Sequence, residues 1–397
     1  MLRRIVLARR SHGLVLPSHL WNGLRSLTTG ETLFRKALEI LAEGEEHHRA
    51  TEELRSKQQY EAWSRSQEKA PKSGGVAVVK TIAKQQRQER EKEEEDAGRF
   101  VKEARKLLEE AAYKHGYPRA VVKLANEELE SAKQEGNSQE EAKLRVKRAM
   151  DMYESANSAE GWFNLGNLLW MGYPDQQEQI VDKLSILLEK NERAAIEAFQ
   201  KAIDLGDLDA MYFVGVQYLS AEDKNDLETT VATNRKGLEL VTTAADKGHS
   251  GALYYLALLS LNGNALLGVD PSVEDYGRWL DLAAEAGDDE ALFLRGHGYF
   301  HGEDGRVRSY GRALEDFLAA AEAGNADAAV SAGAMLHQGI GGVPQDQRRG
   351  FELYQLGGEL GSTEGWRNVV ACYAAGEGVP QSHKMARYIA KTMLKDE

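Results

Sequence analysis

The sequence repeats a pattern built on small residues. The pattern A-A-x-x-G-x-x-x-A-x-x-x-L-G recurs along most of the chain, and one small residue, four positions after the first glycine, marks each copy. That small residue stands at seven positions: Ala120, Gly161, Ala210, Ala252, Ala291, Ala328 and Gly365. The successive spacings are 41, 49, 42, 39, 37 and 37 residues. A period of about 20–50 residues is typical of a solenoid, in which each repeat buries its apolar face against its neighbours.

Several copies also place glycine where a helix is expected, as in AAEAGNADAAVSAGAMLHQG at residues 320–339. A glycine inside a helix costs about 1 kcal/mol relative to alanine, so its recurrence needs a structural reason. We expect Gly324 to end one helix in the left-handed conformation, which glycine adopts without steric cost. We expect Gly333 to lie within the next helix, where the missing side chain lets a neighbouring helix approach closely.

The sequence shows little of the alternating pattern that predicts strands, so it predicts an all-α fold. About seven helix pairs should form an α-solenoid, or superhelix, over residues 101–384. The interval of 49 residues indicates an insertion around residues 173–191, and MARYIAKTML predicts a capping helix at residues 385–397. A charged, helical N-terminal region should precede the solenoid.

Two loops carry a more specific signature, GIGGVPQD (Gly339–Asp346) and GEGVPQS (Gly376–Ser382). Together with the alanine and glycine pattern, they resemble the Sel1-like repeat, a relative of the tetratricopeptide repeat that is made of paired antiparallel helices. The resemblance covers roughly residues 105–382. Ser382 replaces the acid of the family's G-x-G-V-x-x-D loop, and Arg295 replaces the repeat leucine in one copy. The resemblance implies adaptor roles in assembling or retaining membrane-associated complexes.

Residues 1–30 differ in composition from the rest of the chain. They contain five arginines, no acidic residue, several serines and threonines, and leucines at helical spacing, whereas the whole chain has a net charge of −13. This composition is typical of a mitochondrial transit peptide, and the arginines interrupt the apolar stretch that a secretory signal needs. We therefore predict a transit peptide at residues 1–30 and a protein of the mitochondrial matrix or the matrix face of the inner membrane. The alternative is a basic, disordered N-terminus.

Residues 31–100 are rich in charge and poor in large apolar side chains. The segment KQQRQEREKEEED (Lys84–Asp96) mixes both signs without an apolar position, which favours a solvated helix or disorder. We expect a charged helical or partly disordered region here, with a docking arm as the alternative.

Charge and cysteine content limit the classes of partner and site. The acidic balance, with no basic cluster beyond residues 1–30, argues against nucleic-acid binding. Cys372 is the sole cysteine, so an internal disulfide and a zinc site made of cysteines alone are excluded. The long uncharged run at residues 250–269 is interrupted by an Asn-Gly-Asn stretch, so we expect no transmembrane segment. Membrane association would then be peripheral, through a partner.

The sequence offers no catalytic motif. It contains no G-x-x-x-x-G-K-[ST], no H-E-x-x-H and no G-x-S-x-G. His297 and His301 stand at helical positions i and i+4, with Glu303, Asp304 and His337 as conceivable further ligands, whereas zinc needs three or four converging ligands. An ordinary pair of surface or groove histidines explains them better. We expect no catalytic residue, no cofactor, no metal site and no enzymatic activity.

One face of the repeat helix is a candidate binding surface. The residue two positions before the repeat leucine points away from the packed face, since successive helical residues are about 100° apart, and it is aromatic in four successive copies. In tetratricopeptide-like stacks this face lines the concave groove, and the resemblance implies the same here. The candidate groove residues are Phe163, Asn167, Tyr212, Tyr254, Phe293, His297, Phe300, His301 and His337. The sequence leaves open the alternative that these aromatic rings pack against the neighbouring repeat.

We therefore expect a non-catalytic scaffold or adaptor in mitochondria that binds an extended or helical partner polypeptide, with aromatic side chains as hot spots. Assembly or maturation of a mitochondrial complex is the specific case that the resemblance suggests. Two alternatives remain. One is a helical-repeat RNA-binding protein of an organelle, which the acidic balance and the irregular period oppose. The other is a metal-dependent enzyme built on His297 and His301.

Overall fold

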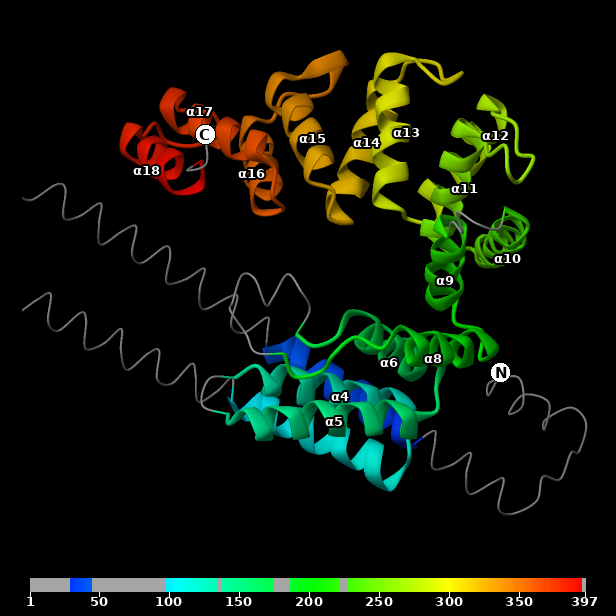
Figure 1. Ribbon diagram of the computed structural model, residues 1–397. Coiled ribbons are helices and arrows are strands. Elements are labelled where there is room, and N and C mark those ends of the chain that lie inside the picture. Colours follow the sequence, from blue (N-terminus) through cyan, green and yellow to red (C-terminus); the bar gives the residue numbers. More distant parts are fainter. Residues whose placement is uncertain (1–28, 45–97, 135–136, 175–185, 222–226, 395–397) are drawn as a thin grey trace, which may run out of the picture. The chain divides into compact units, whose positions relative to one another are not determined.

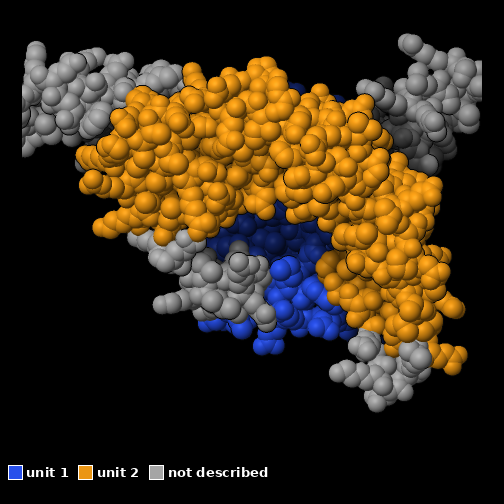
Figure 2. Space-filling model, turned by 90° about the horizontal axis from the view of Figure 1, so that it is seen from above, with its two compact units in different colours: residues 1–207 blue, residues 208–397 orange. Residues whose placement is uncertain are grey.

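In the described residues the regular secondary structure is helical, and turns, loops and two isolated β-bridges connect the helices. In this computed structural model the described residues are 29–44, 98–134, 137–174, 186–221 and 227–394. The prediction of an all-α fold is confirmed. Residues 1–28 of the expected transit peptide and most of the expected charged region lie outside the described residues, whereas residues 29 and 30 begin the first described helix. The chain divides into two compact units, residues 1–207 and 208–397, drawn in different colours in Figure 2.

The first unit consists of antiparallel helices around an apolar core (Figure 1). Its helices are residues 29–44, residues 98–109 with the π-helical turn η1 (Glu110–Lys114), α4 (Pro118–Ala132), α5 (Gln139–Ala156), α6 (Ala159–Met171) and α8 (Glu192–Asp204). Ala37 and Ile40 of the first helix join the same buried cluster as Ala104 and Leu108 of the second and Leu124 of α4. Residues 29–44 therefore belong to the core of this unit in spite of their charged composition.

The second unit is a succession of helices in chain order (Figure 1). They are α9 (Leu208–Ser220), α10 (Leu227–Asp246), α11 (Ser250–Asn262), α12 (Val273–Glu285), α13 (Asp289–His301), α14 (Tyr310–Glu322), α15 (Ala326–Gln338), the 3-10 turn η2 (Ile340–Gly342), α16 (Gln347–Glu359), α17 (Thr363–Ala375) and α18 (His383–Met393). The last helix begins at His383, two positions before Met385. Among the described helices, none is both long enough and apolar enough to span a membrane.

The repeat helices form the pairs that the sequence predicts. In each copy, the helix that carries the tracked small residue packs against the helix that follows it. Within the described residues these pairs are α4 with α5, α6 with α8, α9 with α10, α11 with α12, α13 with α14, α15 with α16, and α17 with α18. The prediction of a solenoid of helix pairs is thus confirmed. The extra residues of the longest interval lie in the connection between α6 and α8.

Two consecutive residues precede most of the helices that carry the tracked small residue. The first has a positive φ, and the side chain of the second caps the helix. Before α13, Gly287 has a φ of 87°, and the carboxylate of Asp288 accepts a hydrogen bond from the N–H of Ala291 at 3.0 Å. Equivalent caps are made by Ser158, His249, Asn325 and Ser362. Gly324, with a φ of 108°, adopts the predicted left-handed conformation after α14. These bonds satisfy N–H groups that have no partner within the first turn of a helix.

The glycines inside the helices make room for aromatic rings of the paired helix. A Cβ on Gly333 of α15 would lie 2.9 Å from the ring of Tyr354 in α16. In the first unit, a Cβ on Gly166 of α6 would lie 2.5 Å from the ring of Phe199 in α8. Both rings are buried. The prediction that Gly333 permits close approach of a neighbouring helix is confirmed.

Two departures from the repeat pattern are compensated locally. Asp346 and Ser382, which occupy the last position of the two signature loops, both cap the following helix by accepting a backbone N–H. Arg295, in the place of the repeat leucine, donates two hydrogen bonds to the carboxylate of Asp316, at 2.9 and 2.7 Å. Ser382 thus caps its helix as an acid would, and Asp316 pairs with the guanidinium that Arg295 places where the repeat has leucine.

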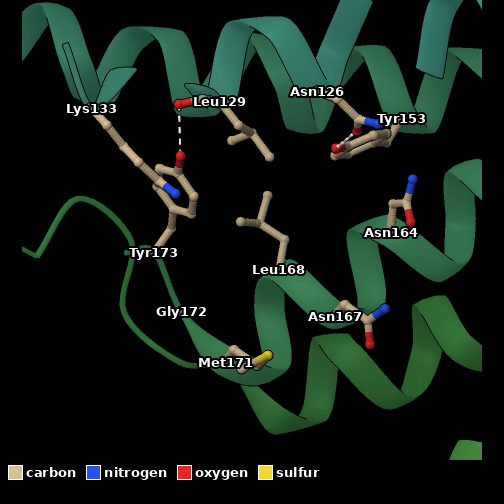
Figure 3. A pocket seen from close by; sticks show the side chains of 10 residues that line it. All are labelled: Asn126, Leu129, Lys133, Tyr153, Asn164, Asn167, Leu168, Met171, Gly172 and Tyr173. Carbon is tan, nitrogen blue, oxygen red and sulfur yellow. Dashed lines mark hydrogen bonds between the residues drawn. The ribbon is translucent and has the colours of Figure 1, made fainter. Parts of the chain in front are cut away.

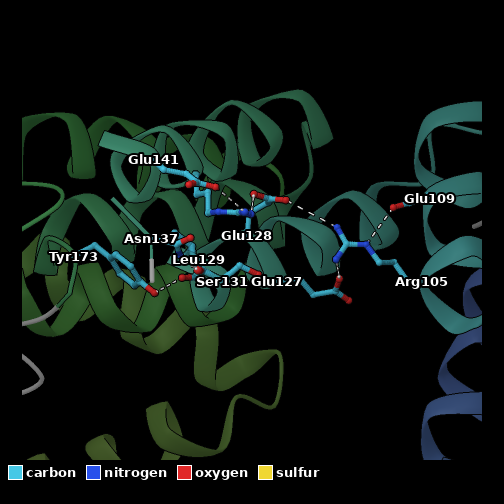
Figure 4. A network of polar contacts seen from close by, with 10 residues as sticks. Arg105, Glu109, Glu127, Glu128, Leu129, Ser131, Asn137, Glu141 and Tyr173 are labelled. Atoms are coloured by element: carbon cyan, nitrogen blue, oxygen red, sulfur yellow. Dashed lines mark hydrogen bonds and ion pairs between the residues drawn. The ribbon is translucent and has the colours of Figure 1, made fainter. Parts of the chain in front are cut away.

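A polar network connects three helices of the first unit (Figure 4). Arg105 pairs with Glu109 of its own helix and with Glu127 and Glu128 of α4, and Arg145 of α5 pairs with Glu128 at 3.2 Å. Burial raises the pKa of Glu127 above its ordinary value, although the nearby Arg105 acts in the opposite direction. The network therefore contains one carboxylate whose charge is unfavourable in the folded state.

Candidate functional site

A pocket of about 290 Å³ opens in the first unit between α4, α5 and α6 (Figure 3). It is lined by Asn126, Leu129, Lys133, Tyr153, Asn164, Asn167, Leu168, Met171, Gly172 and Tyr173. One wall comes from α4, the opposite wall comes from α6 and the two residues after it, and Tyr153 comes from α5. Gly172 has a φ of 77°, and a Cβ there would lie 2.9 Å from the carbonyl oxygen of Leu188. This turn brings Tyr173 back to the pocket.

Three asparagine side chains give the pocket its hydrogen-bonding capacity. The hydroxyl of Tyr153 donates to Oδ1 of Asn126, while the NH₂ group of Asn126 makes no hydrogen bond to the described part of the chain. The carboxamides of Asn164 and Asn167 likewise make none among the described residues. Burial raises the pKa of Tyr153, so its phenol stays protonated and remains a donor. The asparagine end of the pocket is therefore polar but uncharged.

The other end of the pocket combines a cation with an aromatic ring. Nζ of Lys133 lies 5.2 Å from the ring centre of Tyr173 and 3.5 Å from Oε1 of Glu130. The hydroxyl of Tyr173 donates to the carbonyl oxygen of Leu129 at 2.6 Å. Leu129 and Leu168 lie between the two polar ends (Figure 3). Glu130 therefore offsets part of the positive charge at this end.

Two of the asparagines occupy the same position in successive repeats. Asn126 follows Ala120 by six residues, and Asn167 follows Gly161 by the same interval. Since α4 and α6 contact each other, the shared position places both side chains on the same face of neighbouring helices. The sequence analysis selected Asn167 but missed Asn126 and Asn164. A comparison of this one position along the copies would have found Asn126.

The four predicted aromatic residues are half-buried. Phe163 and Phe293 each pack on a buried phenylalanine of the following helix, with ring centres 5.9 and 5.8 Å apart. Burial raises the pKa of both Tyr212 and Tyr254. These rings thus contact the body of their own unit and keep part of their surface exposed. That they line a binding groove stays a prediction.

The remaining predicted residues lie on α13 and α15 in the second unit. His297 and His301 are exposed, with ring centres 4.3 Å apart, and Phe300 packs on a tyrosine of α14. On α15, Nε2 of His337 lies 3.7 Å from Sγ of Cys372, which is buried. In the part of the chain that the structure describes, no three His, Cys, Asp or Glu side chains are grouped so that they could hold a metal ion.

The pairing of helices and the signature loops agree with a comparison with known families. The family model of the Sel1 repeat matches residues 185–207, 250–288, 289–325, 326–362 and 371–391. Over these residues the chain is similar to Sel1 repeats. The matched residues include α8 and the helices from α11 to α16, whereas α4 to α6 and the pair of α9 and α10 are not matched. The unmatched helices nevertheless pair as the Sel1 repeats do.

Several solved structures are similar to this chain. A Sel1 repeat protein from Oxalobacter formigenes is 22% identical, with a TM-score of 0.47, and the match covers 75% of this chain and 78% of that one. A protective antigen of uropathogenic Escherichia coli strains is 15% identical, with a TM-score of 0.37 and coverage of 73% and 71%. An immunity protein from Pseudomonas aeruginosa is 18% identical, with a TM-score of 0.39 and coverage of 62% and 83%. No curated protein sequence matches this chain.

Proposed function

We propose that this protein is a non-catalytic scaffold of mitochondria that binds a partner polypeptide on the exposed face of its repeat helices. Sel1-repeat proteins are generally protein-interaction scaffolds, and their solenoid is typically non-catalytic. The arginine-rich, acid-free composition of residues 1–30 supports the mitochondrial location. Assembly or maturation of a mitochondrial complex is the process that we propose for it.

The pocket between α4 and α6 is the observation that carries the proposal. Its wall combines carboxamides that have unused hydrogen-bonding capacity with leucine side chains, and a polypeptide offers both peptide groups and apolar side chains to such a wall. Asn126 and Asn167 of its wall stand at the same position of their repeats, so this part of the pocket lies on a helix face that recurs from copy to copy.

Proximity labelling in mitochondria tests the binding face. Asn167 and His297 occupy the same position of their repeats, one in each unit, and both are at least partly exposed. We expect Asn167→Glu/His297→Glu to lose specific partner proteins without a change in melting temperature. The matched control is Arg348→Glu, a charge reversal at a side chain that is 83% exposed on α16. The proposal would be contradicted if the unchanged protein, the double variant and the control labelled the same partners equally, or if RNA were enriched instead of protein.

Import tests the location separately. Residues 1–35 fused to a fluorescent reporter should carry it into mitochondria, and replacing Arg3, Arg4, Arg9 and Arg10 by glutamate should leave the reporter in the cytosol, because transit peptides depend on their positive charge. A cytosolic reporter with the unchanged segment would overturn the mitochondrial part of the proposal and leave the scaffold part standing.

A further inference from the structure

We infer that the pocket between α4 and α6 holds a short, extended, uncharged stretch of the partner and recognises it through its peptide groups. The inference rests on the proposed scaffold function and specifies the ligand of that site: a backbone in extended conformation with an aliphatic side chain over the leucines. Three features of the pocket point to this ligand: the asparagine carboxamides, their register, and the pairing of Lys133 with Glu130.

A carboxamide is chemically complementary to a peptide group. Each asparagine side chain offers one acceptor oxygen and two N–H donors, and each peptide group offers one N–H and one C=O. Within the described residues, the carboxamides of Asn164 and Asn167 use none of this capacity, and Asn126 uses only its oxygen, which accepts from Tyr153. The pocket thus presents donors and acceptors together, without a fixed charge at that end.

This capacity favours an extended partner over a helical one. The peptide groups of a helix are already bonded within the helix, so a docked helix would leave the asparagine carboxamides unpaired as it displaced their water. An extended strand has N–H and C=O groups free to pair with them. An extended ligand therefore satisfies groups on both sides of the interface, which a helical ligand does not.

The repeat register fits the spacing of an extended chain. Asn126 and Asn167 stand at the same position of neighbouring helices, and packed helices lie about 8–10 Å apart. An extended chain rises about 3.3 Å per residue, so roughly three residues span from one carboxamide to the other. A pocket of about 290 Å³ is of a size for a short segment of this kind rather than for a folded domain.

The middle and the far end of the pocket indicate which side chains suit it. Leu129 and Leu168 lie between the asparagines and the pair of Lys133 and Tyr173 (Figure 3), so an aliphatic side chain of the ligand would cover them. Lys133 already pairs with Glu130 at 3.5 Å, which reduces its attraction for an acidic side chain. The pocket therefore favours an uncharged residue at its centre.

The test measures peptide binding by the full chain through fluorescence polarisation. The probes are fluorescein-labelled hexapeptides with amidated C-termini, which carry leucine at the third position and a random choice of Ala, Ser, Gly and Thr elsewhere. A second set is identical but N-methylated at the leucine and at the residues on each side, which removes backbone donors and retains the side chains. We expect the first set to bind and N-methylation to weaken binding by about tenfold or more, as the loss of backbone hydrogen bonds predicts.

Variants locate the effect. Asn164→Ala/Asn167→Ala should weaken binding of the unmodified peptides by about tenfold, and N-methylation should then have little further effect, since the same bonds have been removed from the other side. Asn126→Asp keeps the acceptor for Tyr153, removes the N–H donors and adds a negative charge, and it should also weaken binding of the unmodified peptides, with the melting temperature as the check on folding. The matched control is Asn368→Ala, at the position of Asn164 in the last repeat, which should bind as the unchanged protein does.

The possible results separate this inference from the proposed function. Absence of hexapeptide binding, equal binding of the N-methylated peptides, or unchanged binding by Asn164→Ala/Asn167→Ala would each overturn the inference. If partner proteins are still labelled in mitochondria in any of these cases, the scaffold function stands and uses another surface. If no partner is labelled although the peptides bind as expected, the pocket is a peptide site and the scaffold proposal fails.

Discussion

The two units of this protein solve the same packing problem with the same device. In the first unit, Phe199 of α8 lies over Gly166 of α6, and in the second unit Phe317 of α14 lies over Gly296 of α13. Both rings stand seven residues before the glycine position that ends their helix. The family model matches only the second helix of this pair in the first unit but matches both in the second. The contact that joins the helix pair is therefore retained where the surrounding sequence diverges.

The units differ on the exposed face of the same helices. Six residues after the tracked small residue, the first unit has Asn126 and Asn167. At that position the second unit has Val216, Leu258, His297, Ala334 and Ala371. None of these residues is fully buried, and the position varies in size and polarity from copy to copy. The helix pair is thus the same in both units, whereas this position is an asparagine in two copies of the first unit and mostly apolar in the second.

The units also differ in where they place charge. The network of Arg105 in the first unit is partly exposed, with an arginine side chain that is 47% exposed. The pair of Arg295 and Asp316 in the second unit is mostly buried, with side chains that are 17% and 10% exposed. The hydrogen bonds to Asp316 raise the pKa of Arg295, against the effect of burial. Removal of one partner should thus matter much more in the second unit.

The largest effect is expected from the shared aromatic contact. Phe199→Ala and Phe317→Ala should each lower the free energy of unfolding by about 3–5 kcal/mol, because each removes a ring that is almost wholly buried. Urea unfolding followed by circular dichroism measures both. Phe199→Leu and Phe317→Leu are the controls and should lose less. A large loss in one unit and almost none in the other would break the equivalence of the two contacts.

The buried ion pair gives the next effect. Asp316→Ala leaves Arg295 without its partner and should cost about 3 kcal/mol or more, whereas Arg105→Ala in the first unit should cost at most about 1 kcal/mol. The double variant Arg295→Leu/Asp316→Ala copies the residues that Leu165 and Ala198 supply at those positions in the first unit. It should recover most of the loss in thermal unfolding. Failure to recover would mean that the pair has a role beyond replacing the leucine.

Replacing a glycine inside a helix by alanine should change the free energy of unfolding by a smaller amount. The sign depends on whether the new Cβ meets a neighbouring side chain. Gly166→Ala should destabilise by about 1–3 kcal/mol, because its Cβ would meet the ring of Phe199. The matched control is Gly277→Ala in α12, where a Cβ would meet no atom within 4 Å. That variant should stabilise by about 0.5–1 kcal/mol through helix propensity alone. If both variants destabilise equally in thermal unfolding, close approach is not the reason for the glycine.

The smallest effect concerns pH in the first unit. Burial raises the folded-state pKa of Glu127 above the ordinary value of 4.5. The carboxyl therefore loses its proton more readily in the unfolded state, and its contribution to stability falls as the pH rises through the ordinary and then the raised value. Glu127→Gln should thus gain stability relative to the unchanged protein over this pH range. A difference that does not vary with pH, measured by urea unfolding at several pH values, would contradict this.

The fold could be predicted from the sequence because its determinants are local and periodic. The tracked small residues predict the first helix of each pair. Gly324 predicts where one helix ends, and Gly333 predicts the close contact made by the next. From the sequence, Ser382 could either cap the next helix as the acid does or mark the loss of the loop motif. The structure shows the cap, because the Ser382 hydroxyl accepts a hydrogen bond from a backbone N–H of the last helix. The sequence also did not indicate that the helix of residues 29–44 packs on the core. Only Ala37, Ile40 and a few neighbours of this helix face the buried cluster.

The candidate site was predicted only in part. Asn167 was selected from its helical face, and Phe163 and Phe293 from the aromatic spacing, but spacing alone does not state whether a ring touches a partner or the next helix. The structure places both phenylalanines on buried rings of the paired helix. Each of these contacts joins residues of two successive helices of a pair, which the spacing within one helix cannot show.

The all-α repeat, the helix pairs and the turns between them follow from the amino-acid pattern, because each depends on residues within one or two helices. The tertiary structure alone decided where the pocket lies. Tyr153 reaches it from α5, Asn126 from α4, and Tyr173 through the turn at Gly172. These residues share no periodic pattern. They meet because three helices pack at one place, and packing depends on the shapes of all the side chains between them.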